Sequence, residues 1–174
     1  MIIGENMDTK FWIAQLVGVI GYSTLGYSFY KKKKKDILLI QIFSYLVFTI
    51  HYWLLDGITG SVCNLLGLIA FIIIYFFDLY KKNKKILIAI IIPILIFISL
   101  ITYQNIYSIF PIIASVISTL AFITDSEDTI RGIGIIGSIC WLIYSIVYKS
   151  YAAIVFEAIT LIVIIIAYFK RRKK

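Results

Sequence analysis

Long apolar stretches separated by short basic clusters are the feature that most limits how this chain can fold. The stretches fall at about residues 11–30, 37–55, 58–79, 86–103, 107–124, 130–148 and 150–169. About 20 residues of helix cross the hydrocarbon core of a bilayer. In lipid, a helix satisfies its own backbone donors and acceptors, which an irregular chain does not. The sequence therefore predicts an all-α integral membrane protein with seven transmembrane helices.

The composition agrees with a membrane location. Hydrophobic residues make up 61% of the chain, charged residues make up 15%, and the mean hydropathy is +0.98. A water-soluble domain of this length needs a larger polar surface than these residues provide. The formal net charge is +8, but the basic residues flank the apolar stretches, as they do in membrane proteins. No nucleic-acid partner is therefore expected.

The basic residues also predict an orientation. With seven spans, 15 of the 17 Lys and Arg residues fall on one side of the membrane, and Lys10 and Lys149 fall on the other. Cytoplasmic loops carry the excess of Lys and Arg. The N-terminus is therefore expected outside and the C-terminus in the cytoplasm. Few basic residues precede the first stretch, so we expect it to remain as a span rather than be cleaved.

An internal repeat is found when the chain is shifted by 93 residues. The shift aligns the first three stretches with the last three and leaves the fourth as a linker. It pairs small or polar residues at helical spacing: Gly57 with Ser150, Gly60 with Ala153, Asn64 with Glu157, and Gly67 with Thr160. Chance matching in an isoleucine-rich chain is the alternative. The repeat predicts one membrane domain over 1–174, with a three-helix bundle at 9–80, a linker helix at 86–104 and a second bundle at 106–170.

Glu157 is the residue that most strongly indicates a site. A carboxylate inside a span costs about 2.5–3.5 kcal/mol on insertion scales, so it faces a cavity or a partner. It is interpreted as a group that binds substrate or a proton, or alternatively as a buried acid bonded to a hydroxyl group. Asn64 is its repeat equivalent, and serves either in binding or in tying two helices together.

Two aromatic residues are expected in the same layer. Phe48 precedes Asn64 by sixteen residues, and Trp141 precedes Glu157 by the same number. Each lies on the preceding span at a similar depth. Aromatic rings beside polar groups suit sugar-like or ring-bearing solutes, and core packing or contact with lipid is the alternative.

Other polar and small residues are expected to be structural. His51 is expected to bond to the adjoining turn, with a proton relay as the alternative. Gln15 and Gln41 are expected to tie helices together, with ligand binding as the alternative, and Gly60 and Gly67 to allow close helix approach. Cys63 and Cys140 are expected to be buried thiols without metal-binding spacing. No catalytic motif is present, so no enzyme activity, cofactor or metal is expected.

One stretch resembles a known family. The run from His51 to Gly67, HYWLLDGITGSVCNLLG, together with Ser28-Phe29-Tyr30 before the lysine run, Gln41, Trp141 and Glu157, resembles the bacterial inner-membrane YgjV family. That family is related to the SWEET and PQ-loop transporters. The resemblance implies a SWEET-like 3+1+3 arrangement of helices in the bacterial cytoplasmic (inner) membrane, with the N-terminus outside.

The resemblance also implies a solute site. SWEET pockets take an aromatic residue from the second helix and an asparagine from the third helix of each bundle, and Phe48, Asn64, Trp141 and Glu157 fall at matching places. The chain departs from that pattern because it lacks the proline–glutamine pair and because Glu157 replaces an amide. The expected function is transport of a small polar solute by alternating access. The alternative is a membrane scaffold without a solute site. The expected partners are the lipid bilayer and the solute, and a second copy of the chain remains open.

Overall fold

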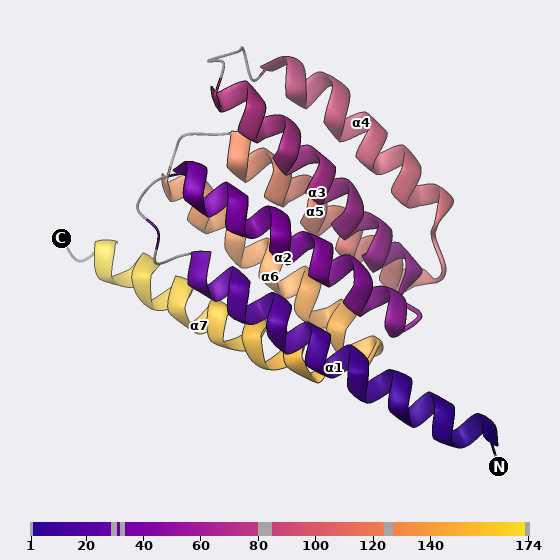
Figure 1. The fold of residues 1–174 in the computed structure, drawn as a ribbon. Coiled ribbons are helices and arrows are strands. Elements are labelled where there is room, and N and C mark those ends of the chain that lie inside the picture. Colours follow the sequence, from indigo (N-terminus) through magenta and orange to yellow (C-terminus); the bar gives the residue numbers. More distant parts are fainter. Residues whose placement is uncertain (1, 29–30, 32–33, 80–84, 124–126, 173–174) are drawn as a thin grey trace.

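The computed structural model describes residues 2–28, 31, 34–79, 85–123 and 127–172, and within these ranges the chain is helical apart from short turns. Figure 1 shows the helices in chain order. They are α1 (Ile2–Ser28), α2 (Lys34–Leu54), α3 (Ile58–Leu79), α4 (Lys85–Ile101), the 3₁₀ turn η1 (Ile106–Ser108), α5 (Ile109–Ile123), α6 (Glu127–Val147) and α7 (Tyr151–Arg172).

The helices coincide with the predicted stretches and differ from them mainly at their ends. Helix α1 begins at Ile2 rather than near residue 11, because the polar residues before the apolar stretch include no proline to stop it. The fifth stretch opens with the 3₁₀ turn η1, and α5 starts at Ile109. The Asn105 side chain caps this turn by accepting a hydrogen bond from the Tyr107 backbone at 3.0 Å.

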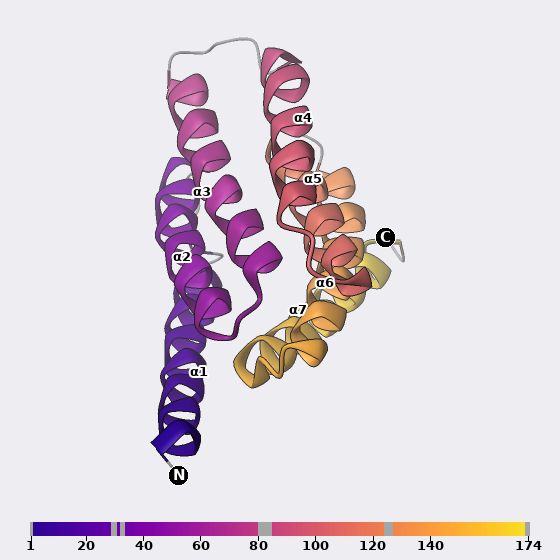
Figure 2. The same ribbon diagram turned by 90° about the vertical axis from the view of Figure 1, so that its right-hand side faces the viewer.

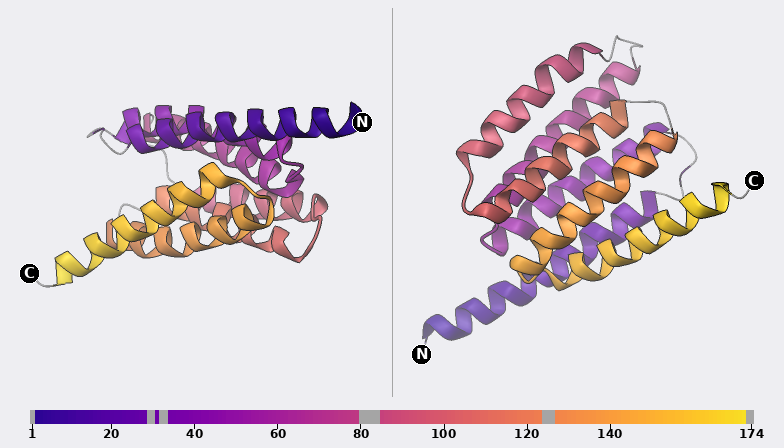
Figure 3. Two further views of the ribbon diagram at one scale, coloured as in Figure 1. Left: turned by 90° about the horizontal axis from the view of Figure 1, so that it is seen from below. Right: turned by 180° about the vertical axis from the view of Figure 1, so that it is seen from behind.

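The helices form two facing layers. In one layer α2 lies between α1 and α3, and in the other α6 lies between α5 and α7. Across the interface α1 packs on α7 and α3 packs on α5, while α4 lies beside α3 and α5. Since the repeat makes α1 equivalent to α5 and α3 equivalent to α7, these two interface contacts are equivalent to each other. The halves are therefore arranged around an approximate two-fold axis (Figures 2 and 3).

The turns that join α2 to α3 and α6 to α7 have the same backbone structure. Each has a residue with positive φ, Asp56 at 59° and Lys149 at 52°. The following residue donates a hydrogen bond to the carbonyl group five positions earlier, from Gly57 to Tyr52 and from Ser150 to Ser145, at 2.9 Å in both turns. This pattern is the Schellman motif that ends a helix. All of these positions are related by 93 residues, so the offset found in the sequence is present in the folded backbone.

The outer surface of the bundle is apolar. Trp12, Leu16 and Val19 on α1 are more than half exposed, and so are Val155 and Ile159 on α7. An apolar surface of this extent suits lipid rather than water. Among the described residues, Lys35–Leu54 and Ile58–Phe77 are long and apolar enough to cross a membrane, and four shorter apolar helices accompany them. The count of seven spans remains a prediction.

Part of the basic clusters behind the predicted orientation lies outside the described residues: Lys32, Lys33, Lys81, Lys82, Lys84, Lys173 and Lys174.

Candidate functional site

Glu157 lies inside the bundle and is 8% exposed. Its carboxyl group interacts with two hydroxyl groups from other helices, those of Ser138 on α6 and Tyr22 on α1. The acid therefore does not face lipid. Because Tyr22 belongs to the first half and Glu157 to the second, their contact joins the two halves.

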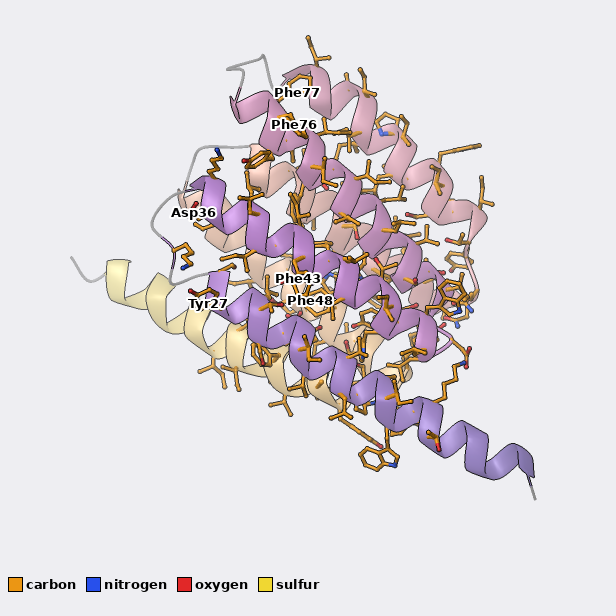
Figure 4. The ribbon with its side chains drawn as sticks, viewed as in Figure 1. Tyr27, Asp36, Phe43, Phe48, Phe76 and Phe77 are labelled. Carbon is orange, nitrogen blue, oxygen red and sulfur yellow. The ribbon has the colours of Figure 1, made fainter. Side chains whose placement is uncertain are left out.

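Phe48 lies midway along α2 (Figure 4) and is 5% exposed. Its ring contacts the Tyr22 ring, with the centroids 4.5 Å apart. The other side of this aromatic group is formed by Phe156 on α7, whose ring is stacked on Tyr22 at 5.0 Å. Phe48 and Glu157 are thus neighbours of the same tyrosine, which places this predicted pair in one region.

Tyr52 and Ser145 meet at the centre of the interface. Their hydroxyl oxygens are 2.8 Å apart, and their positions differ by the repeat offset of 93. Two equivalent residues that touch each other lie on or close to the approximate two-fold axis. Trp141 stacks on the Tyr52 ring at 5.3 Å, so this predicted site residue also lies at the interface.

Asn64 is 2% exposed, and its amide donates to the Gly60 carbonyl group of its own helix at 2.8 Å. The Gly60 backbone N–H donates to the Tyr144 hydroxyl at 2.9 Å. A Cβ atom at Gly60 would lie 2.3 Å from the Tyr144 ring, so only glycine allows this approach. The close contact predicted for this glycine is confirmed, and its partner is the opposite half.

The structure thus places each of the four predicted residues beside one of three tyrosines that the sequence analysis missed. Tyr22 joins Phe48 to Glu157, Tyr52 stacks on Trp141, and Tyr144 reaches the backbone next to Asn64. Tyr52 and Tyr144 also contact each other, with ring centroids 5.5 Å apart. The sequence held one signal for this group, since the polar residues Tyr52 and Ser145 are related by 93 positions.

The end of the bundle that carries the two repeated turns, called the turn end here, is closed by hydrogen bonds between the halves. His51 is fully buried, with Nδ1 2.6 Å from the Ala14 carbonyl oxygen and Nε2 2.6 Å from the Ser150 hydroxyl. Since a carbonyl oxygen only accepts, Nδ1 carries a proton, and in the neutral imidazole the Ser150 hydroxyl then donates to Nε2. The histidine forms structural hydrogen bonds as predicted, but the predicted partner was wrong: the ring bonds to α1 and to the α6–α7 turn of the other half, not to the adjoining α2–α3 turn.

Two glutamines hold the two turns in the same way. The Gln15 side chain accepts from Ala152 N at 3.4 Å and donates to the Lys149 carbonyl oxygen at 3.0 Å. Gln104 accepts from Thr59 N at 3.3 Å and donates to the Asp56 carbonyl oxygen at 3.1 Å. Thr59 and Asp56 are the repeat equivalents of Ala152 and Lys149. The backbone of each turn is therefore hydrogen-bonded to a glutamine side chain from outside its own half.

The profile of the family Imp-YgjV, described as bacterial inner membrane protein, matches residues 12–174. The chain belongs to this family. It is accordingly a protein of the bacterial inner membrane, with the lipid bilayer as its surroundings. Searches of curated proteins and of solved structures returned no match to the chain.

Proposed function

We propose that this inner-membrane protein moves a small polar solute by alternating access, with the turn end facing outside. The observation that carries the proposal is Glu157, a buried acid held between the halves by Tyr22 and Ser138. An ionisable group inside a membrane is expensive unless it lines a pathway or binds a partner. Parallel repeats with a site at their interface are a recurring transporter arrangement.

The two ends of the helix bundle are not closed to the same degree. This difference supports a mechanism in which the first half of the chain rotates against the second. At the turn end, the His51–Ser150 and Gln15–Lys149 contacts tie the halves together, and Gln104 ties the linker to the first half. Toward the C-terminus of α7, the ribbons of α1 and α7 diverge (Figure 3, left). Alternating access requires a state that is tied at one end, and the contacts at the turn end support the proposal in this respect. Opening the turn end then requires these hydrogen bonds to break.

A disulfide across the turn end tests this mechanism. The hydroxyl oxygens of Thr59 on α3 and Ser108 in η1 lie 3.0 Å apart, close enough for the variant Thr59→Cys/Ser108→Cys to form a bond of about 2.05 Å. The control is Thr24→Cys/Ser44→Cys, whose oxygens are 2.9 Å apart within the first half. Both pairs are made in a background with Cys63→Ala and Cys140→Ala.

Uptake of radiolabelled sugars, amino acids and amines into proteoliposomes is the measurement. We expect at least one solute to accumulate with the wild type and with the oxidised control pair. The oxidised Thr59–Ser108 variant should lose that uptake, and reduction with dithiothreitol should restore it. Uptake that persists with the cross-link in place contradicts opening at the turn end, and a panel without any uptake contradicts transport of such solutes.

A membrane scaffold without a solute site is the second candidate, and the packing around Asn64 favours it. The Asn64 amide is bonded to its own helix, and both Asn64 and Phe48 are buried in the bundle. A scaffold needs no motion of its halves. The oxidised Thr59–Ser108 variant would then behave like the wild type in every assay, and no solute would move.

A further inference from the structure

The two repeat-equivalent polar residues have different surroundings. Asn64 bonds to the Gly60 carbonyl group within its own helix. Glu157 instead reaches hydroxyl groups on two other helices, through Tyr22 and Ser138. A neutral solute would be served by an amide at both positions. When ionised, the acid at only one of them places a single negative charge between the halves.

That charge needs compensation inside a medium of low dielectric constant. The carboxyl partners among the described side chains are hydroxyl groups, which stabilise a charge without neutralising it. Lys10, a described cation of α1, lies at the turn end and pairs with Asp56 at 2.7 Å. His51 also lies at the turn end, with both ring nitrogens already bonded.

One aromatic side chain, Tyr22, lies beside the acid, and two further rings pack against Tyr22. The Tyr22 ring, whose hydroxyl group contacts Glu157, packs against Phe48 at 4.5 Å and Phe156 at 5.0 Å. The face of an aromatic ring attracts a cation electrostatically, and this attraction strengthens when water is excluded. The carboxylate and the aromatic group next to it both favour a positively charged ligand.

We infer that the solute bound at Glu157 is a primary amine in its ammonium form, an inference that rests on the proposed function. The three N–H groups of an ammonium ion match three acceptors: the Glu157 carboxylate and the hydroxyl oxygens of Tyr22 and Ser138. The hydrocarbon part of the amine then packs against Phe48. A quaternary ammonium ion has no N–H to donate and binds less well.

The test compares two probes that differ in one group, 4-amino-1-butanol and 1,4-butanediol. Trp12 and Trp53 are 62% and 65% exposed, so Trp12→Phe and Trp53→Phe leave Trp141 as the only fluorescent tryptophan. Titrations of this protein in lipid nanodiscs use constant pH and ionic strength. We expect a saturable change in Trp141 fluorescence with the amine, and an affinity at least tenfold weaker for the diol and for tetramethylammonium.

Variants assign the binding to the site. Glu157→Gln should weaken the binding of the amine at least tenfold. Phe48→Leu should weaken it about 3–10-fold, because the face of the aromatic ring is lost. Ser138→Ala, which removes one acceptor, should have a smaller effect and serves if Glu157→Gln does not fold. Equal responses to the amine and the diol, or amine binding unchanged by all three variants, would overturn the inference. A Trp141 fluorescence change on acidification, without any change on adding the amine, would overturn it as well, in favour of a proton site.

The failure of this inference is distinguishable from failure of the proposed function. If a neutral solute is taken up by a route that the Thr59–Ser108 disulfide blocks, and the amine does not bind, the transport proposal stands and the amine inference is wrong. If the amine binds through Glu157 but vesicles do not accumulate it, the site stands and transport of this ligand is wrong.

Discussion

Asp56 and Lys149 occupy the same left-handed position in two turns that are 93 residues apart, with φ of 59° and 52°. Both residues also offer their carbonyl oxygen to a glutamine side chain, Gln104 for Asp56 and Gln15 for Lys149. The repeat is thus preserved in backbone shape and in hydrogen bonding although the two side chains carry opposite charges. The backbone of these turns, rather than their side chains, is what the two halves share.

The left-handed position predicts the effect of glycine. Replacing Lys149 with glycine removes the steric conflict of a Cβ atom at positive φ, while the backbone bond to Gln15 remains. Lys149→Gly should stabilise the protein by about 0.5–1 kcal/mol, measured as a higher midpoint of thermal unfolding in detergent. Asp56→Gly should gain less, because aspartate tolerates this conformation better and its ion pair with Lys10 is lost. A lower midpoint for Lys149→Gly would contradict this reasoning.

Close helix contacts predict which glycines accept a side chain. A Cβ atom would lie 2.3 Å from the Tyr144 ring at Gly60 and 2.6 Å from the Tyr45 ring at Gly67. Gly60→Ala should therefore destabilise the protein by about 1–3 kcal/mol, and leucine at either position should lower the yield of folded protein further. Gly26→Ala is the control, since its Cβ would meet Phe156 at an ordinary 3.5 Å. Equal midpoints of thermal unfolding for Gly60→Ala and Gly26→Ala would contradict the close packing of Gly60 on Tyr144.

The two glutamines predict unequal costs for the same substitution. Gln15 is 7% exposed and its bonds are partly buried, so Gln15→Leu leaves partly buried backbone groups of the α6–α7 turn without partners, at a cost of about 1 kcal/mol or more. Gln104 is exposed, so water replaces its bonds in Gln104→Leu and the change should stay within about 0.5 kcal/mol. Thermal midpoints of both variants in the same detergent give the comparison. A larger drop in the thermal midpoint for Gln104→Leu than for Gln15→Leu would contradict this prediction.

The distribution of basic residues predicts the orientation. A reporter active only in the cytoplasm should give signal when fused after Lys174 and none when fused before Met1, since 15 of the 17 Lys and Arg residues lie on the C-terminal side of a seven-span arrangement. The matched pair of fusions is compared at equal expression in intact cells. Signal from the N-terminal fusion alone would reverse the orientation and place the turn end in the cytoplasm.

The sequence by itself determined the helices, the membrane setting and the repeat. The length of an apolar stretch and the charges that flank it are local properties of the sequence, so they can be recognised without knowing how the helices pack. The offset of 93 residues, found from small and polar residues such as Gly60 and Asn64, is present in the backbone of both turns. The burial of Glu157 was also predictable, because the cost of an acid in lipid does not depend on which helix covers it.

Only the tertiary structure decided which side chains meet across the interface. Apart from the offset of 93 residues between Tyr52 and Ser145, nothing in the sequence distinguishes Tyr22, Tyr52 and Tyr144 among 13 tyrosines, because their roles depend on the distance between helices far apart in the chain. The role of Gln104 was hidden for a related reason. The repeat equivalent of Gln15 is Ser108, and the 3₁₀ turn before α5 brings Gln104 to the α2–α3 turn instead. Contacts of this kind arise from the path of the backbone in space, which local patterns do not contain.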